Sequence, residues 1–142
     1  MKEQNYSNHT QYVPGYHYLT ATGILALLIG SCINLSHSAK ENLYSASLIC
    51  LISLILCLFF WYMRAFALKA QDRAIRAEEN LRYFILTGKP LPKSLRMSQI
   101  IALRFASDEE LVELAARAVN ENLKSNEIKQ AIRNWRPDHH RA

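Results

Sequence analysis

The chain has 142 residues, half of them hydrophobic, which leaves room for one small domain besides any membrane segments. Its formal net charge of +5 falls entirely after the second of two apolar blocks, and a basic excess beside such a block is first an orientation signal for a membrane protein. The three cysteines, Cys32, Cys50 and Cys57, lie inside these blocks without metal-site or disulfide spacing, which excludes a disulfide scaffold and indicates buried thiols.

The first predicted elements are a cytosolic N-terminal arm over residues 1–17 and a transmembrane helix over residues 18–35. The helix is close to the ~20 residues needed to cross a bilayer, although polar residues such as Asn34 weaken it. A cleaved signal peptide is the poorer interpretation, because the arm is long and His37 occupies the −3 position of the candidate cleavage site.

A short polar loop over residues 36–42 leads to a second transmembrane helix over residues 43–63, so the two helices are predicted to form a hairpin. Small residues recur at spacings of three and four in both helices, and such stripes allow close helix packing in lipid. We expect the stripes to face each other; a homo-oligomer seam is the alternative. The predicted packing residues are Gly23, Ala26, Gly30, Asn34, Ala46, Cys50, Ser53 and Cys57.

Orientation follows from the cations after the second apolar block, because the loop before it carries only Lys40. Lysine and arginine are concentrated in cytoplasmic segments, so the N-terminal and C-terminal parts are both expected in the cytoplasm. An interfacial belt is expected on the same side, formed by Tyr12, Tyr16, Tyr18, Trp61, Tyr62 and Arg64.

The second helix is predicted to continue through residues 64–87 as an amphipathic stalk and to end at Gly88, shortly before Pro90. Two i,i+4 ion pairs are expected to favour the helix by a few tenths of a kcal/mol each: Asp72 with Arg76, and Glu78 with Arg82. One side of the stalk is apolar and small, and such a side normally contacts another helix. This stalk interaction face comprises Phe66, Ala70, Ala74, Ala77, Leu81 and Phe84.

Residues 88–142 are predicted to form a small cytosolic bundle of three short helices. Ser94 or Ser98 opens the first helix, and Ser125 opens the last, which residues 136–137 stop. So small a bundle has a core worth only ~3–5 kcal/mol. We therefore expect it to pack on the apolar face of the stalk, or on that of a second copy.

The middle helix of the bundle has the clearest sequence signal. Ser107 followed by Glu110 predicts a capping box, in which each side chain satisfies a backbone N–H at the helix start. Its apolar face consists of Leu111, Leu114, Ala115, Ala118 and Val119. The inward residues of the last helix are expected to be Ile128, Ala131, Ile132 and Trp135.

Three cations, Lys129, Arg133 and Arg136, are predicted on one side of the last helix and form a candidate contact for anionic lipid or nucleic acid. Four acidic residues within 108–113 would repel a phosphate backbone, which disfavours nucleic acid. A solvated surface of the bundle is the simplest interpretation.

No catalytic motif occurs, so we expect no enzymatic activity, no catalytic residue and no cofactor. The histidines, including His9, His17, His139 and His140, lack metal-ligand spacing, so no metal is expected. The alternative, an enzyme using the carboxylates and arginines of residues 72–82, requires a polar pocket beside them.

Five segments carry a family resemblance: QNYSNH (4–9), YVPGYH (12–17), QDRAIRAEEN (71–80), IALRFASDEE (101–110) and NWRPDHHR (134–141). With them the chain resembles an uncharacterised family of short bacterial membrane proteins along nearly its whole length. The resemblance implies a two-pass protein of the bacterial inner membrane and supplies no active site, ligand or partner.

These patterns predict an all-α protein: a transmembrane hairpin, a stalk and a three-helix cytosolic bundle. The leading functional hypothesis is a non-catalytic, membrane-tethered interaction or scaffold module. It contacts lipid and uses the stalk to self-associate or to dock another membrane protein. The alternative is a membrane-bound regulator whose basic bundle binds anionic lipid or nucleic acid.

Overall fold

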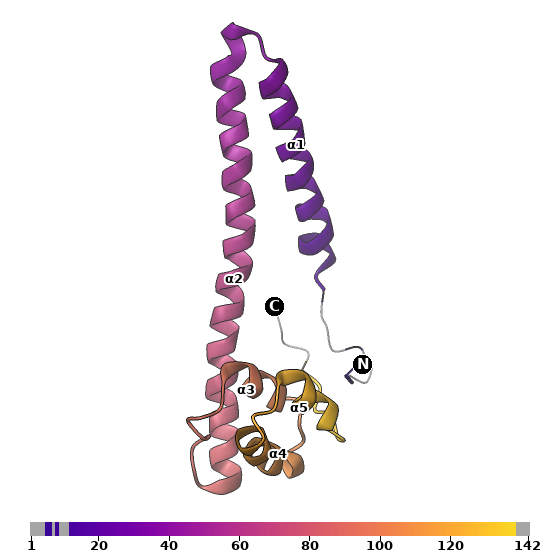
Figure 1. Ribbon diagram of the computed structural model, residues 1–142, viewed down its shortest axis with the longest axis vertical. Helices are drawn as coiled ribbons and strands as arrows, with labels where there is room; N and C mark the ends of the chain where they lie inside the picture. Colours follow the sequence, from indigo (N-terminus) through magenta and orange to yellow (C-terminus); the bar gives the residue numbers. More distant parts are fainter. Residues whose placement is uncertain (1–4, 7, 9–11, 139–142) are drawn as a thin grey trace. The chain divides into compact units, whose positions relative to one another are not determined.

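The computed structural model describes residues 5, 6, 8 and 12–138, and over these residues the protein is all-α, as predicted. The remaining residues, which include eight of the 17 residues of the predicted arm as well as His139 and His140, lie outside the described part, and His9 is one of those eight. The elements in chain order are η1 Gly15–Thr20, α1 Ala21–His37, η2 Lys40–Asn42, α2 Leu43–Thr87, α3 Met97–Leu103, α4 Asp108–Asn120 and α5 Ser125–Ala131 (Figure 1).

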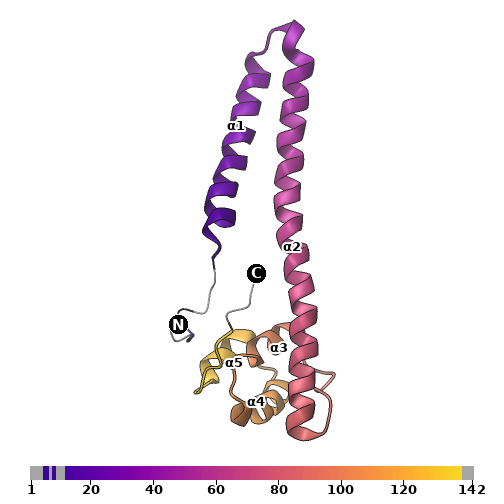
Figure 2. The ribbon, with the colours of Figure 1, turned by 180° about the vertical axis from the view of Figure 1, so that it is seen from behind.

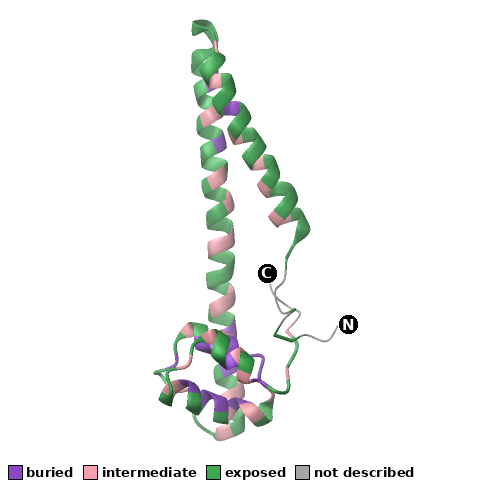
Figure 3. Cartoon of the chain, turned by 45° about the vertical axis from the view of Figure 1, so that its right-hand side comes forward, coloured by how far each residue is buried: buried purple, intermediate pink, exposed green. Residues whose placement is uncertain are grey.

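The chain divides into two compact units, of which one comprises Tyr12–Ala67. Two helical segments, Gly15–His37 and Lys40–Thr87, are long and apolar enough to cross a membrane. Only 6% and 11% of their most apolar stretches are buried, so they differ from the core helices of a soluble domain, which are mostly buried. Figure 3 shows that exposed residues predominate along α1 and the first half of α2, with half-buried and a few buried residues between them.

Within this unit the continuous helical segment formed by η1 and α1 contacts the first part of α2 at two levels. The hydroxyls of Ser31 and Ser53, both buried, lie 2.9 Å apart. The hydroxyl of Tyr16 donates to the carbonyl oxygen of Phe60 over 2.5 Å. These pairings show that the two helices run antiparallel and side by side, as both views of the ribbon show (Figures 1 and 2).

α2 spans Leu43–Thr87 without interruption, in agreement with the predicted helical run from 43 to 86. The helix stops because Gly88 has a φ of 70°, a left-handed conformation that glycine adopts without steric cost. The N–H of Gly88 donates to the carbonyl oxygen of Phe84 over 2.7 Å and satisfies one of the last free carbonyls of the helix.

The second unit contains the rest of α2, from Leu68, and the bundle of α3, α4 and α5. Its core is apolar, with Ile100, Phe105, Leu111 and Ile128 almost completely buried. On α4 the predicted apolar face points inward, and Val119 at its end is half-buried. α5 ends at Ala131, earlier than predicted, because Ile132 is extended, residues 133–134 form a bend, and Trp135 makes an isolated β-bridge with Ala106.

The predicted capping box at the start of α4 is wrong. Ser107 is the residue before the helix, but its side chain makes no capping hydrogen bond. The carboxylate of Glu110 instead accepts hydrogen bonds from the backbone N–H groups of Arg133 and Asn134, at 3.3 and 3.2 Å. These two residues follow α5, so their N–H groups have no acceptor within a helix. The carboxylate of Glu110 supplies that acceptor.

The bundle packs on a side of α2 that differs from the apolar face predicted from the sequence. Ile75 and Glu79 are buried, with 6% of each exposed, and Tyr83 is half-buried against the same core. The expected packing on the apolar face of the stalk is therefore wrong within one chain. Ile75 and Tyr83 provide the apolar contact here, and polar side chains such as Glu79 add to it.

Candidate functional site

The predicted packing residues of the two apolar helices are placed differently in α1 and α2. On α2, Ala46 and Ser53 are buried, and Cys50 and Cys57 are half-buried. On α1, the four predicted residues Gly23, Ala26, Gly30 and Asn34 are exposed. The less exposed side of α1 consists of Ile24, Leu28, Ser31 and Leu35. The prediction chose the stripe with glycine because its side chains are small. In the structure the close contact between the helices is made instead by Ser31 and Ser53.

Of the predicted belt, only Tyr16 makes a defined contact between helices. Its ring stacks on that of Phe60, with 4.4 Å between ring centroids, in addition to its hydrogen bond. Tyr12, Tyr18, Trp61 and Tyr62 are exposed, and Arg64 is half-buried. Phe60 was not among the predicted residues, because an apolar side chain within an apolar block gives no separate signal.

All six residues of the stalk interaction face are exposed. Among the large ones, Phe66 is 61% exposed, Leu81 60% and Phe84 51%. At about 100° per residue, the centre of this face points roughly 160° away from the side that holds Ile75 and Glu79. The bundle of the same chain therefore leaves the stalk interaction face open to solvent.

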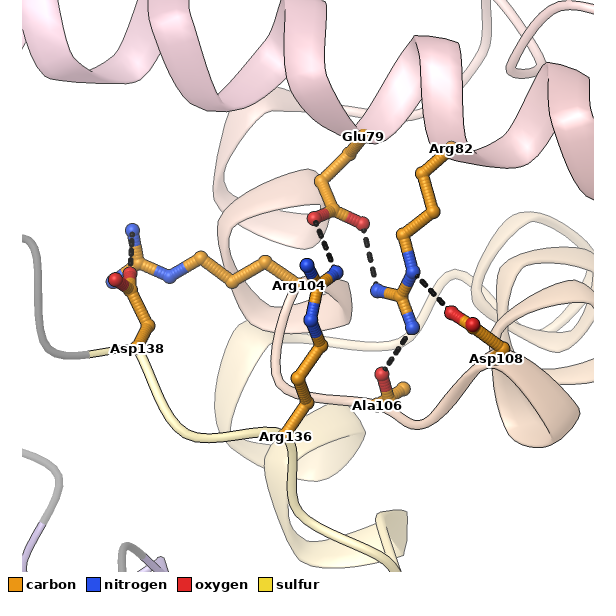
Figure 4. A network of polar contacts seen from close by, with 7 residues as sticks. All are labelled: Glu79, Arg82, Arg104, Ala106, Asp108, Arg136 and Asp138. Atoms are coloured by element: carbon orange, nitrogen blue, oxygen red, sulfur yellow. Dashed lines mark hydrogen bonds and ion pairs between the residues drawn. The ribbon is translucent and has the colours of Figure 1, made fainter. Parts of the chain in front are cut away.

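The opposite side of α2 carries a polar network that joins the helix to the bundle (Figure 4). Arg82 occupies its centre, with its side chain 11% exposed. Its Nη1 donates to the carboxylate of Glu79 over 3.0 Å, its Nε to Asp108 over 2.6 Å, and its Nη2 to the carbonyl oxygen of Ala106 over 2.7 Å. The predicted pair of Arg82 with Glu78 is wrong, because Arg82 turns toward the bundle.

Glu79 is the buried acid of this network, with 7% of its side chain exposed. Burial raises the pKa of its carboxyl group above the ordinary value, and the neighbouring Arg82 and Arg136 lower it only in part. Arg136 approaches the second carboxylate oxygen at 3.8 Å. Glu79 therefore binds one arginine of its own helix and one from the segment that follows α5.

A polar cavity of about 480 Å³ adjoins this network and is lined by residues including Gln71, Glu78, Arg104 and Asp138. Arg104 pairs with Asp138 at 3.3 Å and lies over the ring of Phe105, 4.7 Å from its centroid. Among the described residues, 12–138, those that line the cavity include no serine, cysteine, histidine or lysine. The cavity is a polar pocket of the kind that the enzyme alternative requires, and its ion-paired side chains hold residues 136–138 in place.

Sequence reasoning did not identify this network as a unit. Glu79 and Arg82 were recognised as polar stalk residues, but their partners Asp108 and Arg136 lie 26 residues or more away in the sequence. One signal was present: both polar residues lie on the side of the helix opposite the apolar stripe. Polar residues opposite an apolar stripe are also found on helices whose polar side faces water. Their position therefore did not predict how far Glu79 and Arg82 are buried.

The three cations of the candidate lipid or nucleic-acid contact do not share one helix side. Lys129 lies on α5, above the ring of Phe105 at 5.9 Å, whereas Arg133 and Arg136 follow the end of the helix. Arg136 is also engaged by Glu79. The prediction of a basic stripe assumed that the helix continues to Arg136. Because α5 ends at Ala131, the three cations do not lie along one helix.

Comparison with known proteins finds no match among curated proteins or solved structures. A family model, by contrast, matches residues 1–142, so the resemblance carried by the five segments reflects true membership. The chain belongs to DUF6526, a family of unknown function.

Proposed function

We propose that this protein is a non-catalytic interaction module of the bacterial inner membrane that associates with a second copy of itself through the stalk. The observation that carries the proposal is the exposure of the stalk interaction face on the side of α2 away from the bundle. An apolar stripe on an otherwise charged helix is normally covered by another helix in water.

In this proposal α1 and residues 43–63 of α2 cross the bilayer as a hairpin, and the bundle lies in the cytoplasm. Support comes from the many large apolar side chains that both helices expose outside their mutual contact, for which lipid is the matching solvent. The cations that begin at Arg64 favour a cytoplasmic position for the end of the second crossing, and only Lys40 opposes them in the loop.

A second copy suits the stalk face for two reasons. Insertion in one membrane gives all copies the same orientation, so identical stalks meet in parallel and at the same height. The face also has the spacing of a two-stranded coiled coil, alternating four and three residues over Ala70, Ala74, Ala77, Leu81 and Phe84. Two such repeats are weak alone, but anchoring in a shared membrane raises their effective concentration.

The test is oxidative crosslinking of single cysteines in native membranes, in a background where Cys32, Cys50 and Cys57 are replaced by alanine. Ala70→Cys and Ala77→Cys lie on the face and are expected to give a disulfide-linked dimer. Arg76→Cys is the matched control, because it is exposed on the same helix but points roughly 115° away from the centre of the face.

A dimer from both face positions and none from the control supports the proposal. A product of another size from the face positions identifies a different partner and overturns the second copy as occupant. Absence of any product at Ala70→Cys and Ala77→Cys overturns the interaction function of the stalk altogether.

A further inference from the structure

A groove of about 520 Å³ lies on the flank of α2, beside the connection that leads to α3. The chain reverses at Gly88 and runs back along the end of the helix, as Figure 1 shows. The N–H of Leu91 donates to the side-chain oxygen of Asn80 over 2.9 Å, which fixes the connection two turns before the helix ends. Pro90 and Pro92 on either side restrict the backbone of this wall further.

The described residues that line the groove include three cations, Arg73, Arg76 and Lys93, and no aspartate or glutamate. Over the part of the chain that the structure describes, none of these three cations is placed in an ion pair. Elsewhere in the unit, four arginines each have a carboxylate partner: Arg82, Arg104, Arg117 and Arg136. The positive charge of the groove is therefore concentrated and left for an external anion.

We propose that this groove binds a phosphate group. Two guanidinium groups supply planar pairs of N–H donors that match phosphate oxygens, and Lys93 adds a point charge. The NH₂ group of Asn80 is a further donor, because the oxygen of that amide is already used by Leu91. Three positive charges balance a phosphate monoester or a diphosphate, and the volume falls in the range of ordinary ligand sites.

The phosphate has two sources, a soluble phosphorylated molecule and a phosphorylated lipid headgroup. Arg73 follows Met63, the end of the apolar run, by ten residues, or about 15 Å along the helix. The headgroup layer extends only roughly 5–8 Å beyond the hydrocarbon on each side. A soluble ligand reaches the groove directly, whereas a lipid needs a headgroup that projects well into the water.

The test uses the full-length chain in a non-ionic detergent and two probes. Titration calorimetry with sodium pyrophosphate measures the soluble source, and micelles doped with phosphatidic acid measure the lipid source. Arg73→Gln and Arg76→Gln are each expected to weaken binding about tenfold or more, the loss expected for one charge-assisted hydrogen bond. The control is Arg133→Gln, which removes the same charge from an exposed site outside the groove.

Binding of either probe that falls in the groove variants and survives in Arg133→Gln supports the site, and the probe that binds identifies the source. An equal loss in all three variants shows diffuse attraction to a basic protein and overturns the proposal. Absence of binding of both probes to the unaltered chain overturns it as well. The three replaced side chains are exposed, so unchanged helicity in circular dichroism is expected throughout.

Discussion

Arg82 and Asp108 bind each other across 26 positions of the sequence, with 2.6 Å between Nε and the carboxylate oxygen. Asp108 is the first residue of α4, where a negative charge also interacts favourably with the helix dipole. The same guanidinium binds Glu79 and the carbonyl oxygen of Ala106. One side chain of α2 therefore holds both the start of α4 and the segment that precedes it.

Replacing Arg82 by lysine is expected to destabilise the bundle by about 2–4 kcal/mol, because one ammonium group cannot reach three acceptors and leaves a buried carboxylate poorly paired. Denaturant unfolding of the full-length chain, followed by Trp135 fluorescence in a Trp61→Phe background, measures this change. The control is Arg117→Lys, whose partner Glu121 is about half exposed; its cost is expected to stay below about 1 kcal/mol. Equal losses in the two variants would contradict the central role of Arg82.

Glu79 makes the stability of the bundle depend on pH. Its pKa is raised by burial, so the folded protein binds this proton more tightly than the unfolded chain does. Its contribution to stability is therefore complete below the ordinary pKa of 4.5 and is lost as the pH rises through the raised pKa. Glu79→Gln removes the titrating group and keeps an acceptor for Arg82.

The measurement is the free energy of unfolding of both proteins as the pH is lowered from about 8 toward the ordinary carboxyl pKa of 4.5. We expect the unaltered protein to gain stability relative to Glu79→Gln as the pH falls. Curves that remain parallel over the whole range would show that Glu79 has the same proton affinity in the folded and unfolded states.

Ser31 and Ser53 provide a test of how α1 and α2 pair. Their hydroxyl oxygens lie 2.9 Å apart, so cysteines at both positions are expected to form a disulfide under mild oxidation in a background without native cysteines. The matched control is Gly30→Cys with Ser53→Cys, since Gly30 is exposed on α1. The bond is detected by cleaving the chain with a protease in the loop between α1 and α2 and comparing oxidised and reduced samples by gel electrophoresis. The two fragments remain joined only where the disulfide has formed. Preferential crosslinking of the Gly30 variant would restore the small-residue stripe predicted for α1.

The sequence determines the helices better than it determines their contacts. α2 was predictable from end to end because no proline or glycine interrupts it and Gly88 terminates it. The choice between Gly30 and Ser31 was not predictable, since neighbouring stripes of α1 both satisfy helical spacing. The burial of Glu79 was not predictable either, since its partner Arg136 lies far away in the sequence and approaches it only after the chain has folded back.

The segment after α5 has a consequence for the order of assembly. Arg136 donates its N–H to the carbonyl oxygen of Phe105 over 2.8 Å, Trp135 lies on the ring of Phe105, and Asp138 binds Arg104. A growing chain is released from its N-terminal side first. The bundle consequently cannot close until synthesis has passed residue 138, by which time both apolar helices have already left the ribosome.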